Sequence, residues 1–281
     1  MTKLIVLSCG AGTQSSALAL MSCENKMKGI RHPLVPIYDL IVFADLGEEA
    51  DWVTSQVEFI SKACDKAGIP FYILKTDLYD DYINKFGVSR VAAIPFWSVD
   101  ENGKKAKMRR HCTIDYKIEV INKFVRWEIL GYKKGERTRA EDIKAHEMHI
   151  GFSAEESKRA HNLGICKLFN YKYPLIEMGL ERKDNYKYIL ETWGLEAKAS
   201  ACTICPFHRN YFFKYLKENQ PERYNAVVNL DLLLEKNQPL TPIKSKLYIS
   251  RSRKRILDLT DEDCNDAETF EYNGKAVWNG F

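Results

Sequence analysis

A loop of glycine and hydroxyl residues near the beginning of the chain carries the clearest chemical signal. It joins the apolar run 4–7 to a second apolar run, 17–21. Glycine lets a backbone approach a phosphate closely, and the free N–H groups at the start of a helix point toward such an anion. We therefore expect a phosphate site in this loop, made of Gly10, Ala11, Gly12, Thr13, Gln14, Ser15 and Ser16.

A second signal comes from three cysteines. Cys202 and Cys205 are spaced so that both thiolates can bind one metal centre, and Cys112 is the natural third ligand. One interpretation is a structural zinc site that His208 completes, because tetrahedral zinc takes four such ligands. Another is a dithiol redox pair at the start of a helix expected over 210–219, whose dipole would lower the pKa of a thiol.

The other five of the eight cysteines are expected to have no such role, and all eight are expected to be reduced. Cys9, Cys23, Cys64 and Cys166 lie in or beside apolar stretches, so we expect them to be buried as small hydrophobic side chains. Cys264 is expected to be a lone, exposed thiol.

The order of the apolar runs predicts an α/β fold. Continuous apolar strands separated by helices indicate a parallel sheet with helices on both faces, a Rossmann-like arrangement. Such sheets bind ligands at the carboxyl ends of their strands, where the glycine loop lies. The expected strands are 4–7, 40–44, 70–74 and 149–151, and the expected helices are 15–23, 51–67, 114–130, 183–193 and 210–219.

Two common phosphate loops do not fit this sequence. A Walker loop needs Lys followed by Ser or Thr after its last glycine, but Gly12 is followed by Thr13 and Gln14. A dinucleotide-binding loop needs a third glycine where this chain has Ser15, and an acidic residue about 20 residues further on. Asp45, which closes the second expected strand, lies farther from the loop than that. The loop is therefore of another type.

The loop resembles the pyrophosphate loop of the ATP pyrophosphatase superfamily, Ser-Gly-Gly-x-Asp-Ser. Gly10 stands in the place of the first Ser, and Gln14 in the place of the Asp. Further segments resemble, in the same order, the phosphoadenylyl-sulfate (PAPS) reductase branch of this superfamily, which has an adenine nucleotide alpha-hydrolase-like fold. They are Phe43–Gly47, similar to Phe-x-Asp-Thr-Gly; His111–Lys117, similar to Cys-Cys-x-x-x-Lys; Ile150–Arg159, similar to Gly-x-Arg-x-x-Glu-Ser-x-x-Arg; and Tyr173–Ile176 with Asp184, similar to Pro-Leu…Asp-Val. Ser153 stands in the place of an Arg of this pattern.

The resemblance implies that the chain splits ATP between its α- and β-phosphates. Such a reaction needs a grip on the leaving pyrophosphate and cations, usually Mg²⁺ with Lys or Arg, that neutralise its charge. Ser15 and Ser16 would hold the pyrophosphate, and Asp45 would bind the ribose or the shell of the magnesium ion. The implied catalytic residues are Ser15, Asp45, Lys117 and Arg159, and Asp45 and Gly151 join the loop in binding the nucleotide.

The resemblance also implies an iron–sulfur cluster. Related enzymes with a Cys-Cys pair and a distant Cys-x-x-Cys pair bind a four-iron cluster, and His111 stands here in the place of the first cysteine. Cys112, Cys202 and Cys205 would hold a [4Fe-4S] cluster, with His111 or His208 as the fourth ligand. Zinc is the alternative.

The expected function follows from what this chain lacks. Reductases of this branch carry a nucleophilic cysteine in a Glu-Cys-Gly-x-x-x-His tail, which is absent here. We therefore expect an ATP pyrophosphatase that adenylates a nucleic acid for sulfur incorporation, of the DNA phosphorothioation or tRNA thiolation type. A sulfur-donor protein such as a cysteine desulfurase is the expected partner. The alternatives are a sulfonucleotide (PAPS or APS) reductase and an ATP-binding regulatory module.

Charge and length add weaker expectations. The net charge of +4 neither demands nor excludes nucleic acid, and the six basic residues within 244–255 suit a nucleic-acid backbone, a solvated loop or the phosphates of ATP. We expect an ATP pyrophosphatase domain over 1–220 and a C-terminal appendage over 221–281. No apolar run approaches membrane-spanning length and no leader is recognised, so we expect a cytoplasmic protein without a membrane partner. The oligomeric state is left open.

Overall fold

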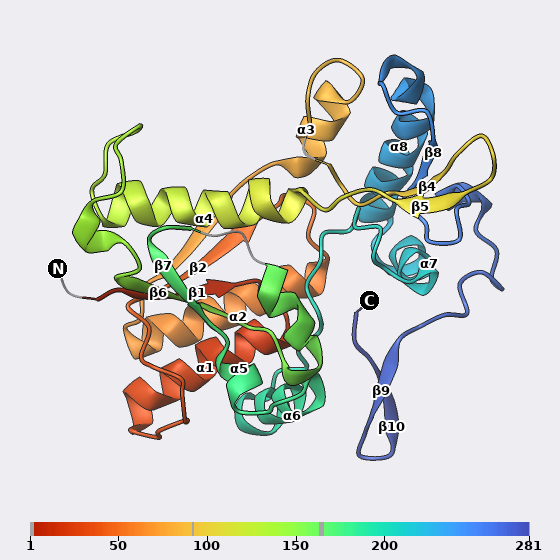
Figure 1. Ribbon diagram of the computed structural model, residues 1–281. Coiled ribbons are helices and arrows are strands. Elements are labelled where there is room, and N and C mark those ends of the chain that lie inside the picture. The colour runs from red at the N-terminus through yellow and green to blue at the C-terminus, as the bar shows by residue number, and fades with distance from the viewer. Residues whose placement is uncertain (1–2, 92, 163–165, 281) are drawn as a thin grey trace. The chain divides into compact units, whose positions relative to one another are not determined.

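A computed structural model describes residues 3–91, 93–162 and 166–280 of the chain (Figure 1). The chain divides into two units, each built from several segments. The first unit contains the chain up to Ala44, Trp52–Leu74 and Ile118–Ser200. The second contains Asp45–Asp51, Lys75–Lys117 and the chain from Ala201 onward. The boundary expected between residues 220 and 221 stays a prediction.

A five-stranded parallel sheet forms the centre of the first unit, in the order β3-β2-β1-β6-β7. Its strands are β1 (Ile5–Cys9), β2 (Leu40–Asp45), β3 (Phe71–Lys75), β6 (His146–Ile150) and β7 (Phe169–Lys172). The interior strand β2 is buried along almost its whole length, because helices cover both of its faces. The predicted α/β fold with a parallel sheet is confirmed.

Helices lie on both faces of this sheet, as predicted. Figure 1 shows α4 on one face, and α1 and α2 on the other. The helices are α1 (Thr13–Lys28), α2 (Asp51–Ala67), α4 (Glu119–Phe124), α5 (Pro174–Glu177) and α6 (Arg182–Trp193), with short 3₁₀ segments at Ala140–Asp142 and Ala154–Asn162. Wider π-helical turns, Ile114–Ile118 and Val125–Ile129, flank α4, so the helix expected over 114–130 is not a regular α-helix throughout.

The apolar core of the first unit lies between α4 and the sheet. It gathers side chains from the sheet, from the segment around α4 and from the loops beside them: Val6, Leu40, Val42, Ala44, Ile121, Val125, Tyr132, Met148, Leu168 and Phe169. Burial of this apolar surface is what holds the strands in register and so positions their carboxyl ends.

The second unit combines a small antiparallel sheet with helices. Its sheet has the order β5-β4-β8 and is formed by β4 (Trp97–Val99), β5 (Lys105–Lys107) and β8 (Lys246–Tyr248). The other elements are α3 (Leu78–Lys85), α7 (Asn210–Asn219), α8 (Pro221–Asn237), the 3₁₀ turns Gln238–Leu240 and Ile256–Asp258, and the hairpin of β9 (Thr269–Tyr272) with β10 (Lys275–Trp278). Helix α8 packs against α3, α7 and β8.

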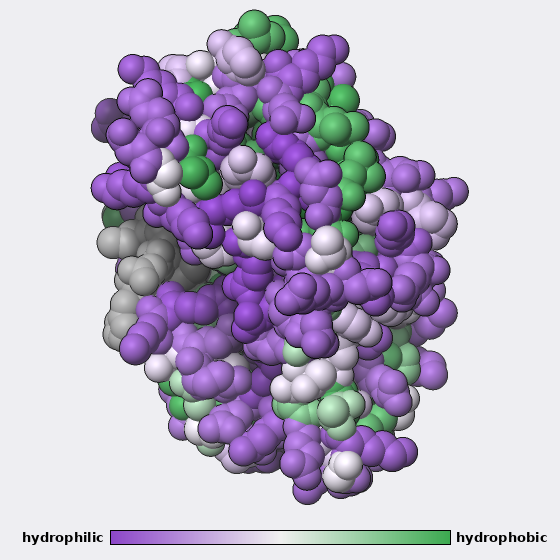
Figure 2. Space-filling model, turned by 90° about the vertical axis from the view of Figure 1, so that its right-hand side faces the viewer, coloured by the Kyte–Doolittle hydropathy of each residue, from purple (hydrophilic) through white to green (hydrophobic). Residues whose placement is uncertain are grey.

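The surface in view is mainly polar. Figure 2 shows hydrophilic residues over most of the face that it presents. Within the described ranges, every helix is too short or too polar to cross a membrane.

Candidate functional site

The glycine loop leads from the carboxyl end of β1 into the first turn of α1. Gly12 is the N-cap residue of α1, and no side chain caps this helix end. Ala11 has a left-handed backbone, with a φ of 54°, which turns the chain between strand and helix. Ser15 Oγ accepts a hydrogen bond from the N–H of Gly10 (3.1 Å) and donates one to the carbonyl of Gly12 (3.3 Å). The loop is thus braced from inside, and the start of α1 has the geometry of an anion site.

Two glycines let other segments approach this loop. A Cβ on Gly151, just after β6, would lie 2.7 Å from the backbone N of Ser15, which leaves room for glycine alone. A Cβ on Gly12 would lie 3.0 Å from the backbone N of Ser200. The structure therefore places Gly151 against Ser15 and Gly12 against Ser200. Ser200 lies two residues before Cys202 in the sequence.

Gln14 connects the loop to the segment after β6. Its side-chain amide donates hydrogen bonds to Ser153 Oγ (3.3 Å) and to Glu156 Oε2 (3.0 Å). The other oxygen of Glu156 pairs with Arg159, whose guanidinium also stacks on Phe152 at 4.5 Å from the ring centroid. Among the described residues, Arg159 is thus linked to the loop through Glu156, and its side chain is about half exposed.

Arg182, at the start of α6, is a second cation beside Glu156 that sequence reasoning missed. Its Nη2 lies 4.0 Å from Glu156 Oε1. Its Nε is buried and has no hydrogen-bond partner among the described residues. A half-buried guanidinium with one unused donor is a candidate contact for a phosphate. No local motif marks Arg182, because only the packing of α6 brings it there.

A small apolar cavity of about 20 Å³, room for little more than a water molecule, lies in the first unit. It is lined by Ser8, Ile118, Ile121, Asn122, Met148, Ile150 and Tyr171. Ser8 and Ile150 stand near the carboxyl ends of the neighbouring strands β1 and β6, which is where parallel sheets bind ligands. Burial raises the pKa of Tyr171 to about 12, so this hydroxyl is neutral and can donate. None of the lining residues was predicted from the sequence to be a site residue.

In the second unit, the structure brings two of the three predicted thiols, Cys202 and Cys205, into contact. The thiols of Cys202 and Cys205 hydrogen-bond to each other, and the main-chain N–H of Cys205 closes a turn on the carbonyl of Cys202 (3.0 Å). The hydrogen bond from Cys202 lowers the pKa of Cys205, and the charges of Arg110 and Lys117 act in the same direction. Burial raises the pKa of Cys112, and the neighbouring Cys205 adds to that effect.

The thiols are donors of the right chemical kind for a soft metal or an iron–sulfur cluster, because such centres are bound by cysteine thiolates. Within residues 3–91, 93–162 and 166–280, however, no three His, Cys, Asp or Glu side chains are gathered in the arrangement of a metal site. The predicted ligand set therefore stays a prediction.

The two histidines proposed as a fourth ligand differ in their surroundings. His208 is buried, its Nε2 lies 3.0 Å from the carbonyl oxygen of Cys202, and its ring stacks on Phe212 with 3.5 Å between centroids. Burial lowers the pKa of His208 to about 3, so its imidazole is neutral. His111 is half-buried, and its main-chain N–H donates to the carbonyl of Ala93 (2.8 Å).

Asp45 and Lys117 also belong to the second unit. Asp45 Oδ1 accepts the N–H of Gly47 (2.9 Å), a local turn just after β2. Lys117 lies near Glu49, a buried residue that the sequence analysis did not name. Burial raises the pKa of Glu49, against the opposing charges of Lys117 and Arg223. The backbone of Glu49 bridges that of Cys202, so this carboxyl group is held beside the thiols.

The remaining cysteines largely follow expectation. Cys9, Cys23 and Cys64 are buried, as predicted, whereas Cys166 is half-buried. The expectation of an exposed thiol at Cys264 was wrong. Cys264 is buried because its segment turns tightly, its N–H bonding to the carbonyls of Thr260 and Asp261, and that burial raises the pKa of its thiol.

Comparison with known proteins does not assign this chain to a family, so its fold alone defines its class. No protein-family model matches the chain, and no curated protein matches it. A solved structure that is similar is the U34-tRNA thiolase NcsA from Methanococcus maripaludis with its [4Fe-4S] cluster, with a TM-score of 0.39 and 16% identity, over 83% of this chain and 72% of that chain. A likeness of this size carries no argument about function. The protein is of the α/β class, with a Rossmann-like parallel sheet whose first strand ends in a glycine–hydroxyl loop.

Proposed function

We propose that this protein is an ATP pyrophosphatase that activates a nucleic acid for sulfur incorporation. An oxygen of the acceptor attacks the α-phosphorus of ATP, the bond between the α- and β-phosphates breaks, and pyrophosphate leaves with Mg²⁺. A sulfur nucleophile then bonds to the acceptor as AMP departs with that oxygen. DNA stands slightly ahead of RNA as the acceptor, and a cysteine desulfurase is the kind of partner that would supply the sulfur.

The uncapped start of α1 is the observation that carries this proposal. Its first turn follows a left-handed residue, Ala11, and the hydroxyl of Ser15 ties the loop together. Gly151 comes so close to Ser15 that no side chain fits between them. An anion held by such preorganised amides is stabilised without further rearrangement, which is what a leaving pyrophosphate requires.

The other roles within the site are proposals of the same kind. Ser15 and Ser16 hold the pyrophosphate, Asp45 binds the ribose or the magnesium shell, and Lys117 and Arg159 neutralise charge. The nucleotide also contacts the loop and Gly151.

Cys112, Cys202 and Cys205 would hold the [4Fe-4S] cluster, with His111 or His208 as fourth ligand, and zinc is the alternative. A bound cluster with an open iron would supply a site that carries sulfur. The chain's own contribution would be to hold Cys202 beside Cys205, where the charges of Arg110 and Lys117 help to lower the pKa of Cys205.

Two other functions remain as alternatives. A sulfonucleotide (PAPS or APS) reductase needs an accessible nucleophilic thiol late in the chain, and the burial of Cys264 counts against it. An ATP-binding regulatory module would bind ATP without releasing pyrophosphate.

Pyrophosphate release tests the proposal. The purified protein is incubated with ATP, Mg²⁺ and single-stranded DNA or tRNA, and released pyrophosphate is measured for the wild type and for Ser15→Ala. A loss of one oxyanion-binding contact costs about a hundredfold in rate. Ser61→Ala, the same change in the half-buried middle of α2, is the matched control and should behave like wild type. Absence of pyrophosphate release from the wild type with every acceptor would refute the proposal.

A further inference from the structure

Three cations lie over one aromatic ring of the second unit. The ring of Trp97, in β4, has the ammonium group of Lys107 at 5.4 Å from its centroid. The guanidinium groups of Arg251 and Arg253 lie at 6.0 Å and 5.2 Å. An aromatic face attracts a cation without neutralising its charge, so the ring holds these groups in place while they stay positive.

A second ring extends this arrangement toward the thiols. Phe207 has Lys107 at 4.3 Å and the guanidinium of Arg110 at 5.3 Å from its centroid. Phe207 comes two residues after Cys205, whose pKa the charge of Arg110 helps to lower. The indole N–H of Trp97 donates to the carbonyl of Pro206 (2.7 Å) and so joins the two rings. We call six residues together the basic–aromatic surface: Trp97, Lys107, Arg110, Phe207, Arg251 and Arg253.

The four cations of this surface differ from several other basic residues of the second unit. Within the described part of the chain, none of the four lies within 4.0 Å of a carboxylate. Neighbouring cations do have such partners: Lys254 with Asp263, Arg255 with Asp231, and Arg209 with Glu268. Of the six basic residues in 244–255, Lys254 and Arg255 are thus held in ion pairs, whereas Arg251 and Arg253 lie over the ring of Trp97.

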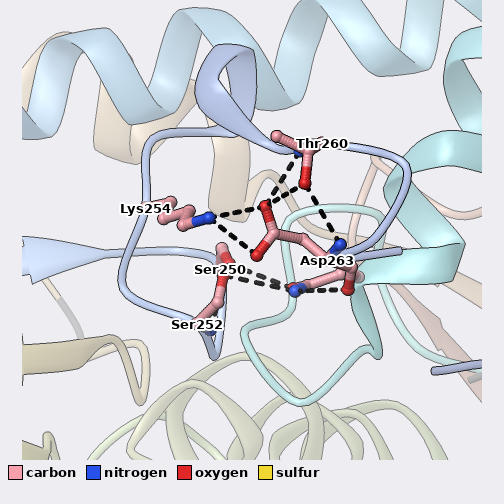
Figure 3. A network of polar contacts seen from close by, with 6 residues as sticks. Ser250, Ser252, Lys254, Thr260 and Asp263 are labelled. Atoms are coloured by element: carbon pink, nitrogen blue, oxygen red, sulfur yellow. Dashed lines mark hydrogen bonds and ion pairs between the residues drawn. The ribbon is translucent and has the colours of Figure 1, made fainter. Parts of the chain in front are cut away.

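A rigid loop presents Arg251 and Arg253. Figure 3 shows part of the polar network that braces it, including Ser250 and Ser252, which hydrogen-bond to each other. Both serines also hydrogen-bond to the side chain of Asn210 at the start of α7. The arginines alternate with these serines along the chain. Arg253 has a φ of 59°, a left-handed backbone that a residue with a side chain adopts only where its surroundings impose it.

Both arginines also have unused donors. Arg251 Nη1 and Arg253 Nε are buried, and neither has a hydrogen-bond partner among the described residues. Burial lowers the pKa of Arg251, and the charge of Arg209 adds to this. Arg253 Nη1 does donate to the carbonyl of Arg251 (3.2 Å), and the charges of Asp266 and Glu268 oppose the lowering of the Arg251 pKa. The donors left over could be satisfied by a phosphate, whose oxygens match the guanidinium fork.

We propose that the basic–aromatic surface binds the phosphodiester backbone of the nucleic acid and brings it to the thiols of the same unit. Four cations spread over two rings match successive phosphates of a chain. The proposal rests on the function proposed above only in taking nucleic acid as the acceptor. DNA and RNA share the phosphodiester chemistry, so the experiment includes both.

Binding of fluorescently labelled single-stranded DNA and RNA of the same sequence to the full-length protein tests this inference, without ATP. Anisotropy is followed from about 50 to 200 mM salt, where each phosphate contact on a single strand contributes about 0.7 to the slope of log K against log salt. Arg251→Gln/Arg253→Gln should weaken binding by about tenfold and lower that slope by about 1.4. Lys244→Gln/Lys246→Gln removes the same charge from exposed positions of the same segment and should leave both values near wild type.

The outcomes are distinct. Loss of affinity for only one of the two nucleic acids in the arginine variant identifies that one as the ligand. Equal effects of the arginine and lysine variants, or wild-type binding by both, would overturn the inference.

Equally tight binding of poly-glutamate, with the same loss in the arginine variant, would also overturn it, because the surface would then bind any polyanion. If the double variant does not fold, as thermal unfolding shows, Lys107→Gln on the exposed strand β5 replaces it. Because no ATP is present, failure here and failure of pyrophosphate release are separate results.

Discussion

The side-chain amide of Gln14 donates a hydrogen bond to Ser153 Oγ at 3.3 Å. Both residues stand where the pattern that this chain resembles has a charged residue, Asp and Arg respectively. The two departures therefore contact each other, and a neutral pair occupies both positions. Gln14 also donates to Glu156 Oε2 at 3.0 Å, so its amide, rather than a carboxylate, suits this place.

This contact predicts the effect of charge at position 14. Gln14→Glu places a carboxylate against that of Glu156 in a buried setting, and we expect it to destabilise the fold by about 1–3 kcal/mol. Glu156→Gln in the same chain should restore part of that loss, because an amide again faces a carboxylate. Urea unfolding of the two single variants and the double variant measures the coupling, expected at about 0.5–3 kcal/mol. Strictly additive effects would show that the two side chains do not interact.

Gly151 predicts a steric effect on the loop. Gly151→Ala puts a Cβ 2.7 Å from the backbone N of Ser15, so the loop must shift, and we expect a loss of about 1–3 kcal/mol in the free energy of unfolding. Gly10→Ala is the matched comparison, since its Cβ would lie 3.5 Å from Ser200 Oγ, an ordinary contact. Chemical denaturation of both variants gives the answer. A Gly151→Ala variant no less stable than Gly10→Ala would contradict this close approach.

The surroundings of Glu24, in α1, lead us to expect that the stability of the fold depends on pH. It is buried and accepts hydrogen bonds from Tyr188 Oη (2.7 Å), Lys28 Nζ (2.9 Å) and His32 Nε2 (2.9 Å). Burial alone would raise the pKa of Glu24, but these donors outweigh it and hold the pKa below its usual value. The carboxylate therefore stabilises the fold fully above its unfolded pKa of about 4.3, and this contribution is lost as the pH falls through the folded pKa.

Glu24→Gln should accordingly cost about 1.5–3 kcal/mol near neutral pH and lose less stability than wild type when the pH falls from about 5 to 3. Urea midpoints measured across this range test the prediction. Glu58→Gln on α2 is the control, because Glu58 is largely exposed and its Oε2 lies as far as 4.0 Å from Lys62 Nζ. An unchanged acid dependence in Glu24→Gln would show that another group governs it.

The thiols predict a bound metal. Protein purified without oxygen should contain iron and acid-labile sulfide, with a brown absorption band, and Ser in place of Cys112, Cys202 or Cys205 should reduce the iron content severalfold. Cys166→Ser, in the other unit, should leave it unchanged. One zinc per chain would select the alternative centre instead. Wild-type protein with neither metal, matching the three variants, would remove the metal centre from the account.

The fold was largely readable from the sequence because its central strands are continuous apolar runs. Residues 40–44, all apolar, lie in β2, and α2 was expected over the residues that it occupies. Strand β7 was missed because it lies at the edge of the sheet and alternates apolar with polar side chains, as in Phe169 and Asn170. The hairpin of β9 and β10 did carry a usable signal, the turn dipeptide Asn273-Gly274, both with positive φ.

The candidate site was readable only where one segment makes it. The loop from Gly10 to Ser16 could be predicted from its composition, and the pair Cys202 and Cys205 could be predicted from its spacing. Arg182 and Glu49 carry no local pattern, because folding alone brings them beside Glu156 and the thiols. The same holds for Trp97 and the arginines that lie over it, which come from distant parts of the sequence.

The bond of ATP that this protein breaks is the most direct test of the central claim. ATP with distinguishable labels on its α- and γ-phosphates is incubated with the wild-type protein, Mg²⁺ and a nucleic acid that the protein binds, and the products are separated. The account predicts pyrophosphate, matched in amount by the α-label found in adenylated nucleic acid together with any AMP, and all of these products lost in Ser15→Ala. ADP with orthophosphate, or intact ATP in the presence of bound nucleic acid, would contradict it.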